Sequence, residues 1–196
     1  MSFLTQQRLA KLGFASLGEN VLISEKASIY GAARICIGSN VRIDDFCILS
    51  AGEQGISLGN YIHIGCYTSL IGMAAISLDD YANLSSRVSI YSSNDDYSGN
   101  HMTNPMVPAQ FTNVDHRPVR IGRHCIIGSG TIVLPGVIME EGSAAGALSL
   151  VTKNCDSFGI YVGVPAGFIK KRKKGLLVCE KRLLLWKASQ TTGAVQ

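Results

Sequence analysis

A six-residue period in the hydrophobic side chains constrains the fold of this chain more than any other feature. From Val119 onward an aliphatic or small residue returns at every sixth position, at Ile121, Ile127, Val133, Met139, Ala145 and Val151. An α-helix would repeat its buried side chains about every 3.6 residues, and a simple strand would repeat them every second residue. A hexapeptide period is typical of a parallel β-helix, in which each hexad forms one face of a coil and its aliphatic side chain points to the axis.

The same period runs through the first half of the chain, with small phase jumps between its runs. The positions are Leu17, Ile23, Ile29, Ile35, Ile37, Ile43, Leu49, Leu58, Ile64, Leu70, Ile76, Leu78, Leu84 and Ile90. A longer similarity of about twenty residues, or three hexads, marks the start of successive coils. We therefore predict one all-β solenoid domain over residues 1–196, with coils at about 17–91 and 119–156.

The composition suits a single globular domain with a continuous core. The chain is 46% hydrophobic and only 16% charged, which is enough apolar surface for one core in 196 residues. No run of about eighteen apolar residues is present, and the start lacks the charged-then-apolar pattern of a signal peptide. We therefore expect a cytoplasmic protein without membrane insertion. The six cysteines are scattered without a CxxC pair, which indicates free thiols.

The net charge of +4 comes chiefly from a short basic run at residues 170–174. Such a run suits a local anion site. It lacks the interleaved aromatic side chains of a nucleic-acid surface, and the rest of the chain is near neutral. We expect no nucleic-acid partner.

Three segments break the period, and a solenoid displays function on such departures. Residues 3–13 carry leucines at near-helical spacing and predict a short N-terminal cap. Leucines and Trp186 among charged residues predict a C-terminal α-helix at about 175–188, packed on the solenoid or on a neighbouring subunit. Residues 92–118 are polar and too long for a simple connection, so we expect them to form a substrate loop.

Two adjacent carboxylates stand out in the substrate loop. Asp95 and Asp96 point to opposite sides if the backbone is extended, so at most one of them faces a substrate. A solvated Asx-rich turn is the alternative for either residue.

The C-terminal third of the chain resembles a known family. The hexapeptide-repeat acyltransferases, which include galactoside and maltose acetyltransferases and sugar-modifying enzymes of O-antigen pathways, end in a segment similar to IGRHCIIGSGTIVLPGVIMEEGSAAGALSLVTKNCDSFGIYVGVPAGFIKKR. The resemblance covers most of the chain, and its most specific parts are SLVTK and VGVPAGFIKKR. It implies a left-handed parallel β-helix, a homotrimer, and acetyl-CoA bound in a groove between neighbouring subunits. None of these three properties follows from the period alone.

The resemblance also assigns residues to the coenzyme. They are Ser129, Ala147, Thr152, Lys153 and Lys170, and we add the neighbouring Gly146 and Arg172 because of their chemistry. Gly146 and Ala147 leave the backbone open to the pantetheine amides, whereas the cations can neutralise the phosphates of the nucleotide end. A solvated surface is the alternative for those cations.

One departure from the family concerns the catalytic base. In galactoside-type acetyltransferases a histidine deprotonates the acceptor hydroxyl, and alignment puts Asp95 in its place. Base assistance is worth about 10² to 10⁴ in rate, and an ordinary Asp with a pKa near 3.9 is a poor base for a hydroxyl. An amine with a pKa of about 8 is partly a free nucleophile at neutral pH without such help.

We therefore expect an acetyl-CoA-dependent N-acetyltransferase for a nucleotide-linked amino sugar, such as a dTDP-4-amino-4,6-dideoxyhexose of bacterial surface polysaccharide synthesis. Asp95 would orient the amine. The side chains expected to contact the substrate are Asn94, Asp96, Tyr97 and His101. The alternative is a sugar O-acetyltransferase of the galactoside or O-antigen type, in which His116 or His101 supplies the base.

Two further classes fit the fold less well. A carbonic-anhydrase-like enzyme needs three histidines brought together on a metal, and the four histidines show no close pair at ligand spacing. We expect no metal, and we expect His63 and His124 to point outward from the coils. A non-catalytic β-helix, such as an ice-binding or scaffold protein, would have no reason to keep a long polar loop.

Overall fold

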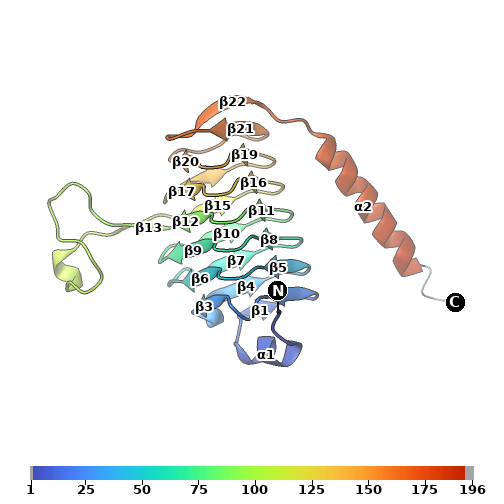
Figure 1. Cartoon of the computed structure of the whole chain (residues 1–196), viewed down its shortest axis with the longest axis horizontal. Helices are drawn as coiled ribbons and strands as arrows, with labels where there is room; N and C mark the ends of the chain where they lie inside the picture. The colour runs from blue at the N-terminus through green and yellow to red at the C-terminus, as the bar shows by residue number, and fades with distance from the viewer. Residues whose placement is uncertain (1, 193–196) are drawn as a thin grey trace.

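The computed structural model describes residues 2–192 and is a solenoid of stacked short strands (Figure 1). The predicted parallel β-helix is confirmed, because strands one coil apart pair in parallel on three faces. The first face contains β1 (Ser16–Leu17), β4 (Ile35–Ile37), β7 (Ile56–Leu58), β10 (Ile76–Leu78), β15 (Val119–Ile121) and β18 (Ile138–Met139). The second contains β2 (Val21–Ile23), β5 (Val41–Ile43), β8 (His63–Ile64), β11 (Asn83–Leu84), β16 (Ile126–Ile127), β19 (Ala144–Ala145), β21 (Gly159–Val162) and β22 (Gly167–Lys171). The third contains β3 (Ser28–Tyr30), β6 (Ile48–Ala51), β9 (Ser69–Gly72), β12 (Ser89–Tyr91), β17 (Ile132–Val133) and β20 (Leu150–Val151).

Turns between the faces stack into three corners. Corner I leads from the first face to the second, corner II from the second to the third, and corner III from the third back to the first. Strands one coil apart pair in register, so equivalent turn residues of successive coils lie directly above one another. Their spacing is that of neighbouring strands in a sheet, about 4.8 Å. Each corner is therefore a continuous column of turns along the solenoid.

The core is the axis of the solenoid, as the period predicts. The six-residue positions are buried from the second coil onward. Leu17 and Ile29, in the first coil, are the exceptions, because β1 and β3 have a strand on one side only. Ile23 of β2 is buried in the same coil, since the N-terminal segment bridges the neighbouring Ser24 through Phe3. Cys47, Cys125 and Cys155 pack in the interior, whereas Cys36 and Cys179 are exposed, and all six thiols are free.

The C-terminal end differs from the expected boundaries. β21 pairs in parallel with β19, so the solenoid continues past residue 156. β22 then returns antiparallel to β21 and ends the sheet. The helix that follows, α2 (Gly175–Thr192), begins at the expected residue and extends beyond residue 188.

Both ends of the solenoid carry a helix. α1 (Gln6–Lys11) is the expected N-terminal cap, and Thr5 accepts a hydrogen bond from the Arg8 N–H at its start while Leu9 is buried. α2 runs back along corner I, because Glu180 binds His124 and Arg123 while Lys187 lies 4.5 Å from the centre of the Tyr61 ring. Within residues 2–192 no helix combines the length and apolarity needed to cross a bilayer.

The expected substrate loop projects from corner III, well away from the coils (Figure 1). Its base is an antiparallel pair, β13 (Ser93–Asn94) with β14 (Asp115–His116), and its tip contains the 3₁₀-helix η2 (Ala109–Phe111). The pair holds the two ends of the loop together where they leave the solenoid.

Candidate active site at corners II and III

A groove of about 750 Å³ lies between the substrate loop and corner III. Asp95 and His116 both line it, together with Arg34, Ser93 and Met73. The two loop residues predicted to be catalytic therefore share one cavity. Apolar side chains of the loop tip form the opposite wall, so the groove combines a carboxylate and an imidazole with a partly water-excluding surface.

His116 is fixed by its neighbour on the paired strand. Its Nδ1 lies 2.8 Å from the Ser93 hydroxyl oxygen, which also accepts a hydrogen bond from the Met73 N–H at 2.8 Å. The imidazole is thus tied to the solenoid backbone through one serine. This contact sets the orientation of the ring in the groove.

Asp96 does not line the groove, although it shares a smaller hollow of the loop with Asp95. It accepts hydrogen bonds from the Ser98 N–H and from His101, both at 2.7 Å. Hydrogen bonds from Ser98 and then His101 lower the pKa of Asp96 to about 2. Because His101 is held by Asp96 and does not line the larger groove, these two side chains organise the loop in this conformation.

The remaining predicted substrate residues lie close to Asp95. Asn94 donates a hydrogen bond to the Asp95 carbonyl at 3.1 Å, and Tyr97 is almost fully exposed. A smaller hollow of about 140 Å³ is lined by Asp95, Asp96, Tyr97 and Thr103.

Three of the predicted coenzyme residues stack on corner II. Ser129 and Ala147 are exposed at equivalent turn positions of successive coils, and Gly146 precedes Ala147. A methyl group on Gly128 would lie 2.4 Å from the Ala147 nitrogen, so the close approach of these turns requires glycine. Ser129 and Ala147 therefore present small, exposed side chains along the corner.

The other predicted coenzyme residues lie elsewhere on the chain. Thr152 and Lys153 are exposed in a corner III turn, and Lys170 is exposed on β22. Arg172 is at corner I, where it donates hydrogen bonds to the carbonyls of His124 and Gly142 at 2.8 and 3.0 Å. Within one chain, the residues predicted to bind the coenzyme therefore do not lie in a single site.

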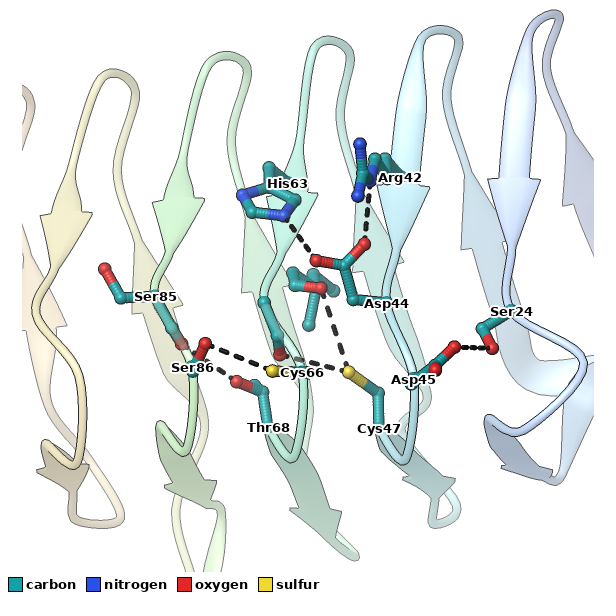
Figure 2. Close-up of polar contacts among 12 residues, drawn as sticks. Ser24, Arg42, Asp44, Asp45, Cys47, His63, Cys66, Thr68, Ser85 and Ser86 are labelled. Carbon is teal, nitrogen blue, oxygen red and sulfur yellow. Dashed lines mark hydrogen bonds and ion pairs between the residues drawn. The ribbon is translucent and has the colours of Figure 1, made fainter. Parts of the chain in front are cut away.

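Corner II carries a polar cluster that sequence analysis missed (Figure 2). Ser85 and Ser86 occupy the turn positions that Gly128 and Ser129 occupy in the next coil, because β11 pairs with β16. The Ser86 hydroxyl lies 3.3 Å from the Cys66 sulfur, and Thr68 donates to the Ser85 carbonyl at 3.0 Å. The equivalence with Ser129 was the only signal in the sequence that could have found these serines.

An ion-paired group lies beside this cluster on the second face (Figure 2). Asp44 accepts hydrogen bonds from Arg42 at 2.7 Å and from His63 at 2.9 Å, and the other His63 nitrogen lies 3.0 Å from Asn83. Although burial opposes ionisation, His63 and Arg42 lower the pKa of Asp44. The nearby thiol of Cys47 is not a nucleophile at neutral pH, since burial raises its pKa to about 11.

Comparison with known proteins identifies the family. A curated relative from Escherichia coli, dTDP-4-amino-4,6-dideoxy-D-glucose acyltransferase, is 56% identical over 180 residues, which cover 92% of this chain and 94% of the relative. The chain belongs to the hexapeptide-repeat acyltransferases. No family model matches it. The expectation of an acyltransferase is confirmed.

Solved structures support the same assignment to the hexapeptide-repeat acyltransferases. AntD, an N-acyltransferase from Bacillus cereus solved with dTDP and 3-hydroxybutyryl-CoA, is 46% identical, covers 95% of this chain and 98% of its own, and superposes with a TM-score of 0.92. AntD variants changed at one aspartate or one serine were solved with coenzyme A and either dTDP or dTDP-4-amino-4,6-dideoxyglucose.

A more distant sequence relative is a putative lipopolysaccharide O-acetyl transferase of Escherichia coli K12, WbbJ, which is 26% identical over 81% of this chain and 80% of its own.

The histidines of this hexapeptide-repeat acyltransferase lie in separate environments. His63 points outward on the second face as expected, whereas His124 stacks on Tyr81 and is covered by Glu180 of α2. His101 and His116 belong to the substrate loop. No group of three metal-binding side chains occurs in the described part of the chain.

Proposed function

We propose that this acyltransferase transfers the acetyl group of acetyl-CoA to the amino group of dTDP-4-amino-4,6-dideoxy-D-glucose. The observation that carries the proposal is the 56% identity to the acyltransferase of that name over nearly the whole of both chains. The amine nitrogen attacks the thioester carbonyl, the carbon–sulfur bond breaks, and coenzyme A leaves as the thiol. The nitrogen loses a proton and an amide is formed.

The reaction centre would be shared between copies of the chain. Asp95 and His116 lie at corner III, whereas Ser85, Ser129 and Ala147 lie at corner II, and the third face separates these corners on one chain. A neighbouring copy that places its corner III beside corner II would bring the two sets together. A homotrimer, as the family resemblance implies, would form three such sites.

Asp95 would orient the amine in this site. In AntD the aspartate and the serine that were replaced lie ten residues apart. Ser85 and Asp95 have this separation, and so do Ser86 and Asp96. Asp95 is the aspartate that lines the groove, which favours the first pair. Its carboxylate would accept a hydrogen bond from the free amine and receive the proton that the nitrogen loses as the amide forms.

The coenzyme would lie along the subunit junction. Its pantetheine would run past Ser129, Gly146 and Ala147, where the side chains are small. Thr152 and Lys153 of corner III would face it from the neighbouring copy, and Lys170 would meet the phosphates. Arg172 already bonds two backbone carbonyls at corner I, so its role would be to anchor the segment that leads to α2.

Substrate contacts in the loop would come from the side chains around Asp95. Asn94 would bond sugar hydroxyls, and the exposed ring of Tyr97 would cover the sugar or base. Asp96 and His101 would hold the loop around the acceptor through their mutual contact. The product would serve bacterial surface polysaccharide synthesis in the cytoplasm, in keeping with the lipopolysaccharide relative.

O-Acetylation remains a second candidate for one reason. His116 lines the groove beside Asp95 and could act as the base that a hydroxyl acceptor needs. The two candidates make opposite predictions for the acceptor, so one assay separates them.

The assay follows thiol release from acetyl-CoA with dTDP-4-amino-4,6-dideoxyglucose and with its 4-hydroxy counterpart. Turnover with the amine alone supports the proposed function. Turnover with the hydroxyl sugar alone overturns it and makes His116 the candidate base. A parallel series with 3-hydroxybutyryl-CoA, the donor bound to AntD, tests the choice of acetyl group.

A further inference from the structure

Two columns of bulky side chains stand on turn positions with positive φ. Tyr61, Tyr81 and His124 form the column at corner I. Phe46, Tyr67 and Arg87 have φ of 61, 61 and 62° and form the column at corner II. Glycine or asparagine adopts this backbone conformation most easily. Other coils have asparagine or glycine at the equivalent positions, such as Asn40 at corner I and Gly130 at corner II, so three successive large side chains in each column point to a use for the side chains themselves.

The corner I column has a partner within the chain. Tyr61 and Tyr81 stack at 5.0 Å, Tyr81 and His124 stack at 4.7 Å, and α2 covers the column through Lys187 and Glu180. Its rings and imidazole thus dock the C-terminal helix.

The corner II column is open, since Phe46 is 45% and Tyr67 is 52% exposed. Their rings stack with centres 4.9 Å apart, Lys26 lies 5.3 Å from the Phe46 ring, and Arg87 lies 5.5 Å from the Tyr67 ring. Lys26 is paired with Asp45 at 3.4 Å. Arg87 has no acidic partner at salt-bridge distance among residues 2–192, so its charge is available to an anion.

The position of this column along corner II indicates which anion. Arg87 follows Ser85 and Ser86 in one turn, and Ser129 and Ala147 lie one and two coils toward the C-terminus. If the coenzyme occupies those C-terminal coils and the acyl group meets the amine near Ser85, the rest of the acceptor extends toward the N-terminal coils. Three steps of about 4.8 Å separate Arg87 from Lys26, which gives a surface about 14 Å long.

We propose that the corner II column, Lys26, Phe46, Tyr67 and Arg87, binds the nucleoside diphosphate half of the acceptor. Arg87 bonds the diphosphate, and the exposed flanks of Tyr67 and Phe46 hold the pyrimidine base. Arg87 can leave the Tyr67 ring at little cost, because an exposed cation–π contact is weak, whereas a guanidinium–phosphate contact is strong. This inference rests on the proposed function, since it takes a nucleotide-linked sugar as the acceptor.

Equilibrium binding of two probes, dTDP and deoxythymidine, separates the two roles. Tyr67→Ala should weaken both probes about 10-fold or more, because it removes the ring surface under the base. Arg87→Gln should weaken dTDP about 10-fold and leave deoxythymidine unchanged, because only dTDP carries the diphosphate. The KM for acetyl-CoA should stay unchanged in both variants.

Matched variants keep the test independent of folding. Tyr67→Phe retains the ring and should bind dTDP as the wild type does. Tyr30→Ala removes an equally exposed ring on β3, outside the column, and should have no effect. Thermal melting identifies any variant that is unfolded, in which case Tyr67→Leu replaces Tyr67→Ala.

Wild-type dTDP affinity in both Tyr67→Ala and Arg87→Gln would overturn the inference while leaving the proposed function intact. So would loss of oligomer mass in Tyr67→Ala on size-exclusion chromatography, which would assign the column to a contact between subunits. If the wild type does not acetylate the dTDP-linked amino sugar but both variants lose dTDP affinity, the proposed function fails and the column stands as a dTDP site.

Discussion

Substitution of Gly128 by alanine tests the stacking of corner II turns directly. The added methyl carbon would lie 2.4 Å from the Ala147 nitrogen and 2.8 Å from both Ala147 Cα and Gly146 C, where ordinary contacts begin at 3.4 Å. The turns must therefore separate by roughly 1 Å, the difference between 3.4 and 2.4 Å. Both neighbours are backbone, and the Gly128 N–H is bonded to the Ala145 carbonyl at 2.8 Å, so the coils resist this movement.

Overpacking of this kind typically costs about 1 to 3 kcal/mol in the free energy of unfolding. For a chain of this size each kcal/mol corresponds to about 2 to 4 °C in melting temperature, so we expect a decrease of about 2 to 12 °C. Displacement of Ala147 should also raise the KM for acetyl-CoA if the coenzyme lies along this corner. Gly167→Ala is the control, because its methyl group would have no neighbour within 4 Å. A Gly128→Ala protein that melts with the wild type would refute the steric argument.

Three further predictions follow from side chains of the loop and of α2. Asp95→Asn should lower kcat about 10²-fold or more while the KM for acetyl-CoA stays unchanged, and wild-type kcat would remove Asp95 from the mechanism. Glu180→Ala should lower the free energy of unfolding by about 1 to 3 kcal/mol and expose α2 to proteases, because the half-buried glutamate holds both Arg123 and His124. The exposed Glu53→Ala is its control, and equal melting of the two variants would contradict the role of Glu180. The Asp96–His101 contact should persist at neutral pH and weaken as pH falls from 3.8 toward about 2, because the folded loop lowers the pKa of Asp96. A rate of proteolysis within the loop that stays constant across this pH range would contradict the prediction.

The coils could be predicted from sequence because their signal is local and repeated. Ile121 and the aliphatic residues that follow it every six positions each indicate the β-helix, and their burial confirms this prediction. The exceptions arise at the end of the stack, where Leu17 lacks a neighbouring coil on one side. The aliphatic period itself stops before β21, because Phe158 and Gly159 interrupt the pattern there.

The candidate site was predictable only in part, because its members come from different corners. The loop composition pointed to Asp95 and His116, and the structure places both in one groove. The positive charge of Arg172 suggested a phosphate contact, but the sequence does not show that its side chain reaches the His124 carbonyl at corner I. Ser85 and Ser86 lacked a local signal, since two serines in a turn are common. The contacts of α2, such as that of Glu180 with His124, join residues 56 positions apart, and no repeat in the sequence indicates them.

The paired base of the substrate loop has a consequence for how such a protein can change over evolution. The coils on either side of the loop stay in register, with Ile76 opposite Val119 and Ile90 opposite Val133, as though the loop were absent. A segment inserted at a corner in this way can be lengthened, exchanged or rewritten while each rung keeps its hydrogen bonds. With the coenzyme along the rungs as proposed, the rungs would keep the geometry of the thioester while the inserted segment adapts to a new acceptor.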